Sequence, residues 1–277
     1  MQTPILLAVA GLLALASIPA QSESTDCSNP TIVVPDGRLN ESVFPAPPPG
    51  KTNTTYWYGF FGQSGHSYAI EFLSPADNDP IHNSTTVSFN TFQVWGPNDV
   101  LTSCNGNSSV NKVSTSAYSP VLMHNPGYGD GERFAFTAAT PGLYLMTISN
   151  SGGTGNYTFR VVDTTLFNPR WSTWSGYDTQ WGFANLCDMA ITGTLIVYDS
   201  NGYLVTQVSF TLTASGQPGS YTLRNSSAGD LNIARNRNGY AVFSYNGPPQ
   251  AIQADAYFIN ATATVIVPTK FESRNSQ

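Results

Sequence analysis

Aromatic side chains gather in one segment near the middle of the chain, NPRWSTWSGYDTQWGF, which begins at Asn168. Surfaces of this composition can bind sugars, because the C–H face of a pyranose stacks on an aromatic ring while Asp, Asn and Gln bond to its hydroxyls. Trp171, Trp174 and Tyr177 are therefore candidate ligand-binding residues. The alternative is structural, since Trp and Phe are first of all core residues. We expect at least one of Trp171 and Trp174 to be buried between two domains.

Acidic side chains suggest a second site. Asp77 and Asp79 flank an asparagine, and Asp130 lies in a later loop of the same half of the chain. Calcium takes several oxygen ligands, and extracellular modules use it to hold loops, so Ca²⁺ is the cofactor that these residues would suit. The alternative is that Asp and Asn are present for turns, where their side chains bond to nearby backbone groups. The sequence contains no Asp-x-Asp-x-Asp-Gly loop to favour the metal.

Three cysteines are present, so at least one is left over if a disulfide forms in an oxidising compartment. Cys27 and Cys104 both lie in polar, loop-like surroundings, and we predict that they form a disulfide. Cys187 follows Asn185 at the end of a predicted strand. We expect it to be a buried, reduced thiol, because a lone cysteine in such a place is more often a small core residue than a nucleophile.

Motifs of secreted hydrolases are missing from the sequence. No His-Glu-x-x-His motif occurs, and His66, His82 and His124 stand apart from one another. The second half of the chain has no histidine to activate Cys187. We expect no enzymatic activity, with a hydrolase whose site is not recognisable as the alternative.

The N-terminal residues indicate export. Residues 5–20 are almost wholly apolar, and a run of about sixteen residues is too short to span a bilayer but suits a signal peptide over residues 1–20. An uncleaved anchor is the alternative. No second apolar run of spanning length follows, so we expect no membrane span in the mature chain and a secreted, periplasmic or cell-envelope location. The formal net charge of −6 argues against a nucleic-acid partner, which requires a basic surface.

Composition and pattern predict an all-β fold. Only 10 % of the 277 residues are charged and 40 % are hydrophobic, which leaves too few charges for the outer faces of helices. Residues 56–61 and 67–73 are aromatic runs around a Gly-rich turn and predict a hairpin. A second hairpin is predicted around residues 199–202, Asp-Ser-Asn-Gly. Trp181 and Phe183 share one face of a predicted strand and are expected in the core.

Three segments resemble a known family: TYWYGFFGQSGHSYAIEF, TFQVWGPNDVL and FAFTAATPGLYLMTISNSGGTGNYTFRVV. They are similar to the bacterial pre-peptidase C-terminal domain, a jelly-roll-like β-sandwich that accompanies secreted proteases and other exported proteins. The resemblance covers roughly residues 51–163 and implies a secreted accessory domain without catalytic activity. Residues 103–131 depart from the family pattern as an Asn- and Ser-rich insertion without a predicted strand, which puts any family ligand site in doubt.

The expected organisation is two consecutive antiparallel β-sandwiches, jelly-roll-like and then Ig-like in size. They span residues 51–163 and 164–270, after a Pro-rich leader over residues 21–50 and before a flexible tail over residues 271–277. We expect proteases to cut near residues 164–168 or within the insertion at residues 103–131.

The expected function is a non-catalytic binding or structural module whose partner is an extracellular protein or a polysaccharide. A carbohydrate-binding accessory protein that uses the aromatic segment is the alternative.

Overall fold

The computed structural model describes residues 23–44, 54–73, 89–97, 121–123, 133–150, 155–227, 229–260 and 266–273. These ranges are built almost entirely of β-strands, which confirms the predicted all-β class. The helical element among them is one 3-10 turn, Trp174–Gly176. Within the same ranges, no helix has the length and apolar character to cross a membrane. The predicted signal peptide lies outside the described residues.

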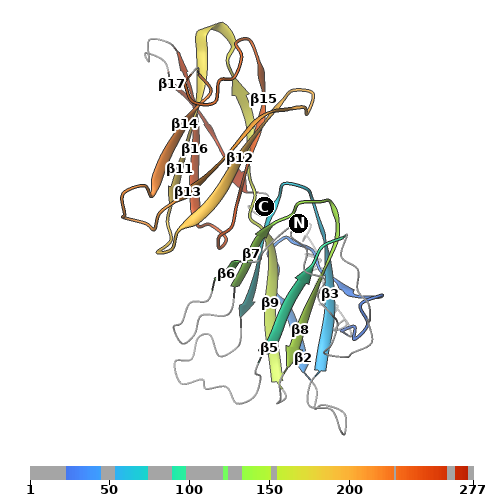
Figure 1. Ribbon diagram of the computed structural model, residues 1–277. Helices are drawn as coiled ribbons and strands as arrows, with labels where there is room; N and C mark the ends of the chain where they lie inside the picture. The colour runs from blue at the N-terminus through green and yellow to red at the C-terminus, as the bar shows by residue number, and fades with distance from the viewer. Residues whose placement is uncertain are drawn as a thin grey trace, which may run out of the picture.

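The first sandwich is the lower lobe of Figure 1. Sheet 1 has the strand order β1-β3-β8-β5, and sheet 2 has the order β2-β9-β4-β7-β6. The described pairs are antiparallel except for the two-residue parallel pair of β1 with β3. The strands are β1 (Thr31–Ile32), β2 (Asn40–Phe44), β3 (Thr54–Gly62), β4 (Ser67–Leu73), β5 (Phe89–Trp95), β6 (Val121–Met123), β7 (Arg133–Thr137), β8 (Gly142–Asn150) and β9 (Gly155–Asp163).

The second sandwich is the upper lobe, in which β14, β11 and β16 lie on one side and β12 and β15 on the other (Figure 1). Sheet 3 has the order β13-β12-β15-β10-β18, and sheet 4 has the order β14-β11-β16-β17. The strands are β10 (Leu166–Ser172), β11 (Tyr177–Asn185), β12 (Ile191–Asp199), β13 (Leu204–Leu212), β14 (Tyr221–Asn225), β15 (Asn238–Tyr245), β16 (Ile252–Asn260), β17 (Ile266–Lys270) and β18 (Glu272–Ser273).

Successive side chains of a strand point to opposite faces of the sheet, and aromatic rings on the inward faces fill the two cores. Tyr58 and Phe60 of β3 point into the first core. Trp181 and Phe183 of β11 point into the second core, as predicted, and the ring of Phe183 stacks on Phe243 with centroids 4.2 Å apart. Burial of a large apolar side chain stabilises a fold by about 1.5 to 3 kcal/mol. Burial of these rings therefore stabilises both sandwiches.

The hairpin predicted for residues 56–73 does not form, because β3 and β4 belong to opposing sheets. The turn between them passes from one sheet to the other instead of joining two neighbouring strands of one sheet. Phe60 and Tyr68 consequently face each other from opposite sheets with ring centroids 5.2 Å apart. The second predicted hairpin does form, as β12 and β13 pair around a turn in which Asp199 Oδ1 accepts from the backbone N–H of Tyr203 at 2.9 Å.

Three segments expected to lie outside regular structure contribute strands. The leader expected over residues 21–50 supplies β1 and β2, which pair with β3 and β9. The insertion expected over residues 103–131 supplies β6, which pairs with β7. The tail expected from residue 271 begins with the buried Phe271 and the strand β18, which pairs with β10. Such short strands lack enough residues to show alternation, so the sequence pattern did not reveal them.

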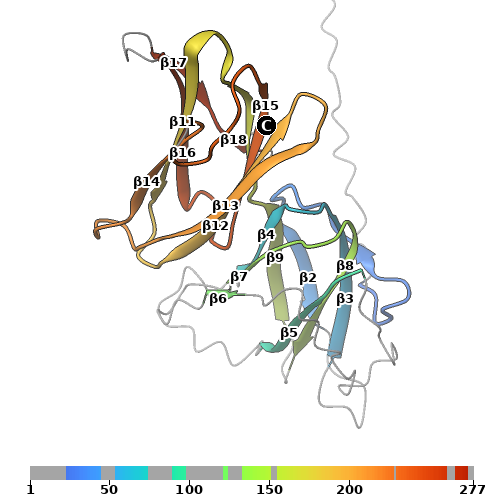
Figure 2. The same cartoon turned by 45° about the horizontal axis from the view of Figure 1, so that its top comes forward.

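The junction between the sandwiches is polar and buried. Thr164 and Thr165, which connect β9 to β10, are both buried beside Ser67. The backbone N–H of Thr164 donates to the Ser67 carbonyl at 2.9 Å, and the N–H of Ser67 donates to Thr165 Oγ1 at 2.9 Å. Tyr245 at the end of β15 donates its N–H to Ser67 Oγ at 3.1 Å. Figure 2 shows β4 and β9 directed at the second sandwich. The connection expected to be exposed at residues 164–168 is therefore held inside this contact.

Candidate functional site

Trp171 is fully buried in the second core. Its indole Nε1–H donates to the carbonyl oxygens of Tyr198 and Tyr240 at 2.7 and 3.1 Å. A ring in this position offers no face to a ligand, so the expectation that Trp171 binds a ligand is wrong. The expectation that at least one of Trp171 and Trp174 is buried is correct. Its location is different, because Trp171 lies within the second sandwich and not between the two.

Trp174 is 51 % exposed on the 3-10 turn between β10 and β11. β10 starts beside the junction and runs away from it, and its last residue pairs with Asn238 at the start of β15. The turn that follows β10 therefore lies at the end of the second sandwich away from the junction. We call this the distal end (Figure 1). Ser175 and Gly176 have φ of 54° and 80°, a left-handed conformation that reverses the chain within three residues. Tyr177 follows at the start of β11 and is half-buried.

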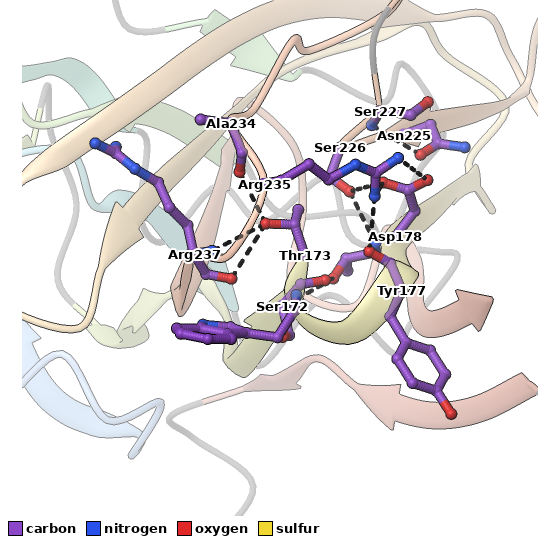
Figure 3. A network of polar contacts seen from close by, with 12 residues as sticks. Ser172, Thr173, Tyr177, Asp178, Asn225, Ser226, Ser227, Ala234, Arg235 and Arg237 are labelled. Carbon is purple, nitrogen blue, oxygen red and sulfur yellow. Dashed lines mark hydrogen bonds and ion pairs between the residues drawn. The ribbon is translucent and has the colours of Figure 1, made fainter. Parts of the chain in front are cut away.

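Thr173 fixes the base of this turn. It is buried, its N–H donates to the Arg237 carbonyl at 2.8 Å, and its carbonyl accepts from the N–H of Asn236 at 3.2 Å. Its hydroxyl donates to the Ala234 carbonyl at 2.8 Å and accepts from the Arg237 N–H at 3.1 Å. Figure 3 shows the bonds of Thr173 with Ala234 and Arg237, two residues of one loop. The turn that carries Trp174 is thus bound to the loop between β14 and β15.

An ion pair joins the same loop to the start of β11. Arg235 Nη1 and Nη2 lie 2.8 and 3.2 Å from Asp178 Oδ1 and Oδ2, a two-bond geometry that orients the guanidinium (Figure 3). Nη1 also donates to the Tyr177 carbonyl at 3.0 Å, and Ser226 donates to Asp178 Oδ1 at 3.2 Å. The Arg235 side chain is 53 % exposed. Such a pair adds little to stability, and its effect here is to hold two loops in one arrangement.

The distal end therefore combines one exposed indole with the charged and amide-bearing residues of the β14–β15 loop. The indole offers a face for stacking, and the exposed Arg235 and Arg237 offer hydrogen-bond donors. Sequence reasoning missed this loop. Asn232 and Asn236 have φ of 51° and 60°, and Asn is the residue after glycine that best tolerates this conformation. The run NIARNRNG was thus a signal for a compact, turn-rich loop.

The calcium candidates Asp77, Asp79 and Asp130 lie outside the described residues, so that site stays a prediction. Among the residues that are described, no three His, Cys, Asp or Glu side chains are grouped as a metal site requires.

Cys27 is disulfide-bonded, and Cys187 is a reduced thiol. Cys104 lies outside the described part of the chain, and its pairing with Cys27 stays a prediction. Cys187 is half-buried and packs against the second core, so it is less enclosed than expected. Its backbone N–H donates to Asn185 Oδ1 at 2.9 Å, within the turn that follows β11.

A cleft of about 410 Å³ lies beside the junction. Its size falls in the range of about 300 to 1,000 Å³ of small-molecule sites. Apolar side chains of both sandwiches line it, together with the amides of Gln250 and Gln253. Asp163, also in its lining, bonds to His66 Nδ1 at 2.9 Å and to the Thr165 N–H at 3.0 Å.

No family model and no curated protein matches the chain. Two solved structures described as a glycosyl hydrolase family 2 member from Bacteroides cellulosilyticus, one of them from strain DSM 14838, are similar at 11 % and 10 % sequence identity. The alignments cover 82 % and 80 % of this chain but 30 % and 26 % of those chains, with TM-scores of 0.18 and 0.20. The chain thus spans less than a third of their length, and TM-scores this low support no inference about activity.

Proposed function

We propose that the chain is a non-catalytic binding module that acts outside the cytoplasm and that the distal end of the second sandwich is its contact surface. The observation that carries this proposal is the exposed indole of Trp174 on a turn fixed by Thr173. The second core already contains Trp171 and Trp181, so packing does not account for an exposed third indole. Tryptophan on a preordered surface is a frequent energetic centre of binding sites.

Acid and base groups of the first sandwich form hydrogen bonds and ion pairs with one another, which supports the non-catalytic part of the proposal. His66 and Asp163 bond to each other beside the junction with little exposure of either side chain. Glu71 is buried and paired with Arg160 at 2.5 Å. These acid and base groups are engaged in hydrogen bonds within the protein that hold strands and sandwiches together. The resemblance of residues 51–163 to an accessory domain points in the same direction.

A second candidate function is a carbohydrate-binding accessory protein. The observation that favours it is again Trp174, because one indole face with nearby amide- and guanidinium-bearing residues suits a pyranose ring. Asn236 bonds to the carbonyl of Thr173, the residue that precedes Trp174. This backbone bond places Asn236, whose side chain carries an amide, at the base of the turn.

Substitution of Trp174 tests both statements. Trp174→Ala should reduce retention on insoluble cellulose, chitin or peptidoglycan about tenfold if the ligand is a polysaccharide. Phe61→Ala is the matched control, since Phe61 is an exposed aromatic residue of the first sandwich. Equal retention of wild type and Trp174→Ala would contradict the carbohydrate function of the distal end. Turnover of ester, glycoside or peptide substrates that survives repurification would contradict the non-catalytic proposal.

A further inference from the structure

The outer face of sheet 4 carries a tyrosine that lies across a glycine. Tyr221 of β14 is opposite Ala184, and Gly182 is opposite Leu223 on the same face. A Cβ atom built on Gly182 would lie 2.9 Å from Tyr221 Oη and 3.5 Å from Tyr221 Cε2. The Tyr221 ring can therefore rest on β11 only because residue 182 has no side chain. The side chain is nevertheless 54 % exposed, so the ring covers the strand while it remains open to solvent.

Polar groups of β16 adjoin this ring. In the register of β11 with β16, Asp255 is opposite Gly182 and Gln253 is opposite Ala184. Tyr257 is opposite Gln180 on the same face of β11. Desolvation, followed by the charges of Tyr257 and Asp255, raises the pKa of Tyr221 above its ordinary value. Gln253 Nε2 lies 3.5 Å from Asp255 Oδ2. We call Tyr221, Gly182, Gln253, Asp255 and Tyr257 the Tyr221 platform.

The platform is continuous with a hollow in the surface. Gln253 belongs to the platform and also lines the cleft of about 410 Å³ beside the junction. A ligand that lies over Tyr221 can thus extend along β16 toward this cleft. Flat aromatic surface, hydrogen-bonding groups and a bordering cleft are the three features by which extended ligands gain contact area.

We infer that the Tyr221 platform binds a neutral polysaccharide, with a pyranose ring stacked on Tyr221 and its hydroxyls bonded to Gln253, Asp255 and Tyr257. Stacking uses the exposed face of the ring, and a carboxylate, an amide and a phenol supply acceptors and donors for hydroxyl groups. Charge supports a neutral ligand. Asp255 would repel polyanions, as would the chain's net charge of −6, and Lys270, opposite Asp255 on β17, offsets the attraction for cations.

This site is separate from the distal end. Tyr177, next to the Trp174 turn, begins β11, whereas Ala184 opposite Tyr221 lies seven residues further along it. At about 3.3 Å per residue the two places are roughly 23 Å apart. The inference therefore goes beyond the proposed function and does not require Trp174.

Affinity electrophoresis of the full chain tests it, in gels that contain hydroxyethyl cellulose, a mixed-linkage β-glucan or a soluble xylan. We expect the wild type to be retarded in at least one gel. Tyr221→Ala should bind about tenfold more weakly. Gly182→Ala should also weaken binding, because its Cβ lifts the tip of Tyr221 from the strand. Tyr203→Ala is the matched control, since Tyr203 is an exposed tyrosine of the same sandwich. Thermal melts verify that each variant is folded.

Three outcomes would overturn the inference. One is the absence of retardation of the wild type in every gel. Another is wild-type retardation of Tyr221→Ala and Gly182→Ala. The third is a dimer of the wild type that Tyr221→Ala dissociates without any polysaccharide binding, which would assign the face to a second copy of the chain. Loss of binding in Trp174→Ala but not in Tyr221→Ala would support the distal end and exclude the platform, so the two proposals fail separately.

Discussion

The indole nitrogen of Trp171 donates to two backbone carbonyls inside the second core, whereas the indole of Trp174 is at the surface. Truncation of the buried ring leaves a cavity and removes the donor from both carbonyls. We expect Trp171→Ala to lower the free energy of unfolding by about 3 to 5 kcal/mol and Trp174→Ala by less than about 0.5 kcal/mol. Urea unfolding followed by circular dichroism measures both. Similar losses in the two variants would contradict the assigned burial.

A β-bulge explains why sequence pattern could not separate these two tryptophans. In the pairing of β10 with β15, Asn168 is opposite Ala241 and Trp171 is opposite Gly239. The stretch of β10 thus holds one residue more than its partner, and both Asn168 and Trp171 point inward. Strict alternation would place residues an odd number apart on opposite faces. The aromatic segment was visible in the sequence, but the bulge that turns Trp171 inward and the 3-10 turn that exposes Trp174 were not.

Tyr245 provides a pH test of the second core. Burial is the main cause that raises its pKa above the ordinary value of 10.0. Between the pKa values of the unfolded and folded states, the unfolded chain loses the phenol proton while the folded chain keeps it. Folding stability should therefore be complete below pH 10 and fall as the pH rises above it. Chemical unfolding from pH 8 to pH 11.5 should show a shallower decline for Tyr245→Phe. Identical slopes for this variant and the wild type would contradict the assignment.

The three cysteines give a direct chemical prediction. With Cys27 in a disulfide and Cys187 reduced, titration of the unfolded, non-reduced chain should find one thiol, and Cys104 should be the partner of Cys27. Closure of a loop of about 77 residues stabilises a fold by roughly 4 kcal/mol in the chain-entropy model. Peptide mapping under non-reducing conditions identifies the bonded pair. Three titratable thiols would exclude the bridge.

At the scale of elements, the connection between the sandwiches should resist proteolysis. Thr164, Thr165 and Asn168 are all buried, and buried backbone is not accessible to a protease. Residues 215–219 between β13 and β14 are exposed instead. Brief subtilisin digestion followed by mass spectrometry should show cleavage within residues 215–219 before any within 164–168. Early cleavage at the connection would show that the junction opens readily.

The sequence predicted long strands well and short strands poorly. β3, β4 and β12 carry enough aromatic and β-branched residues to reveal their period. β1 and β18 have two residues each, too few for any period, and gain their place by pairing with β3 and β10. The β3–β4 connection was misjudged for another reason. A Gly-rich turn between two strands fits a hairpin and a crossing between sheets equally well, and only the two opposing sheets distinguish them.

The same limit applies to the candidate sites. The aromatic segment at residues 168–183 was visible as a pattern, and Trp174 remains its exposed candidate. Tyr221 and Asp255 are 34 residues apart and become neighbours only through their pairing with opposite sides of β11. No local sequence motif predicts such a surface. It arises from sheet order, which is a property of the whole fold.

At the scale of the molecule, hydrogen bonds set the orientation of the two sandwiches. Ser67 is completely buried between them. Its hydroxyl accepts from Thr164 Oγ1 at 2.9 Å and from the Tyr245 N–H at 3.1 Å. Ser244 donates to the Gly65 carbonyl. Bonds of this kind are directional and lie in a place that water does not reach, so they favour one arrangement over neighbouring ones.

Replacement of Ser67 by alanine tests whether this contact couples the sandwiches. The change leaves two buried donors unpaired, at a cost of about 1 to 3 kcal/mol, and the cost falls on the junction because the donors belong to the second sandwich and its connection. We expect calorimetry to show one cooperative transition for the wild type and two separated transitions for Ser67→Ala. Ser209→Ala is the matched control, since its hydroxyl bonds to Thr194 at 2.8 Å on an exposed face. A single transition in Ser67→Ala, shifted no further than in Ser209→Ala, would show that the sandwiches unfold together for another reason, such as the proximity of Ile196, whose Cδ1 would lie 3.4 Å from a Cβ atom placed on Gly65.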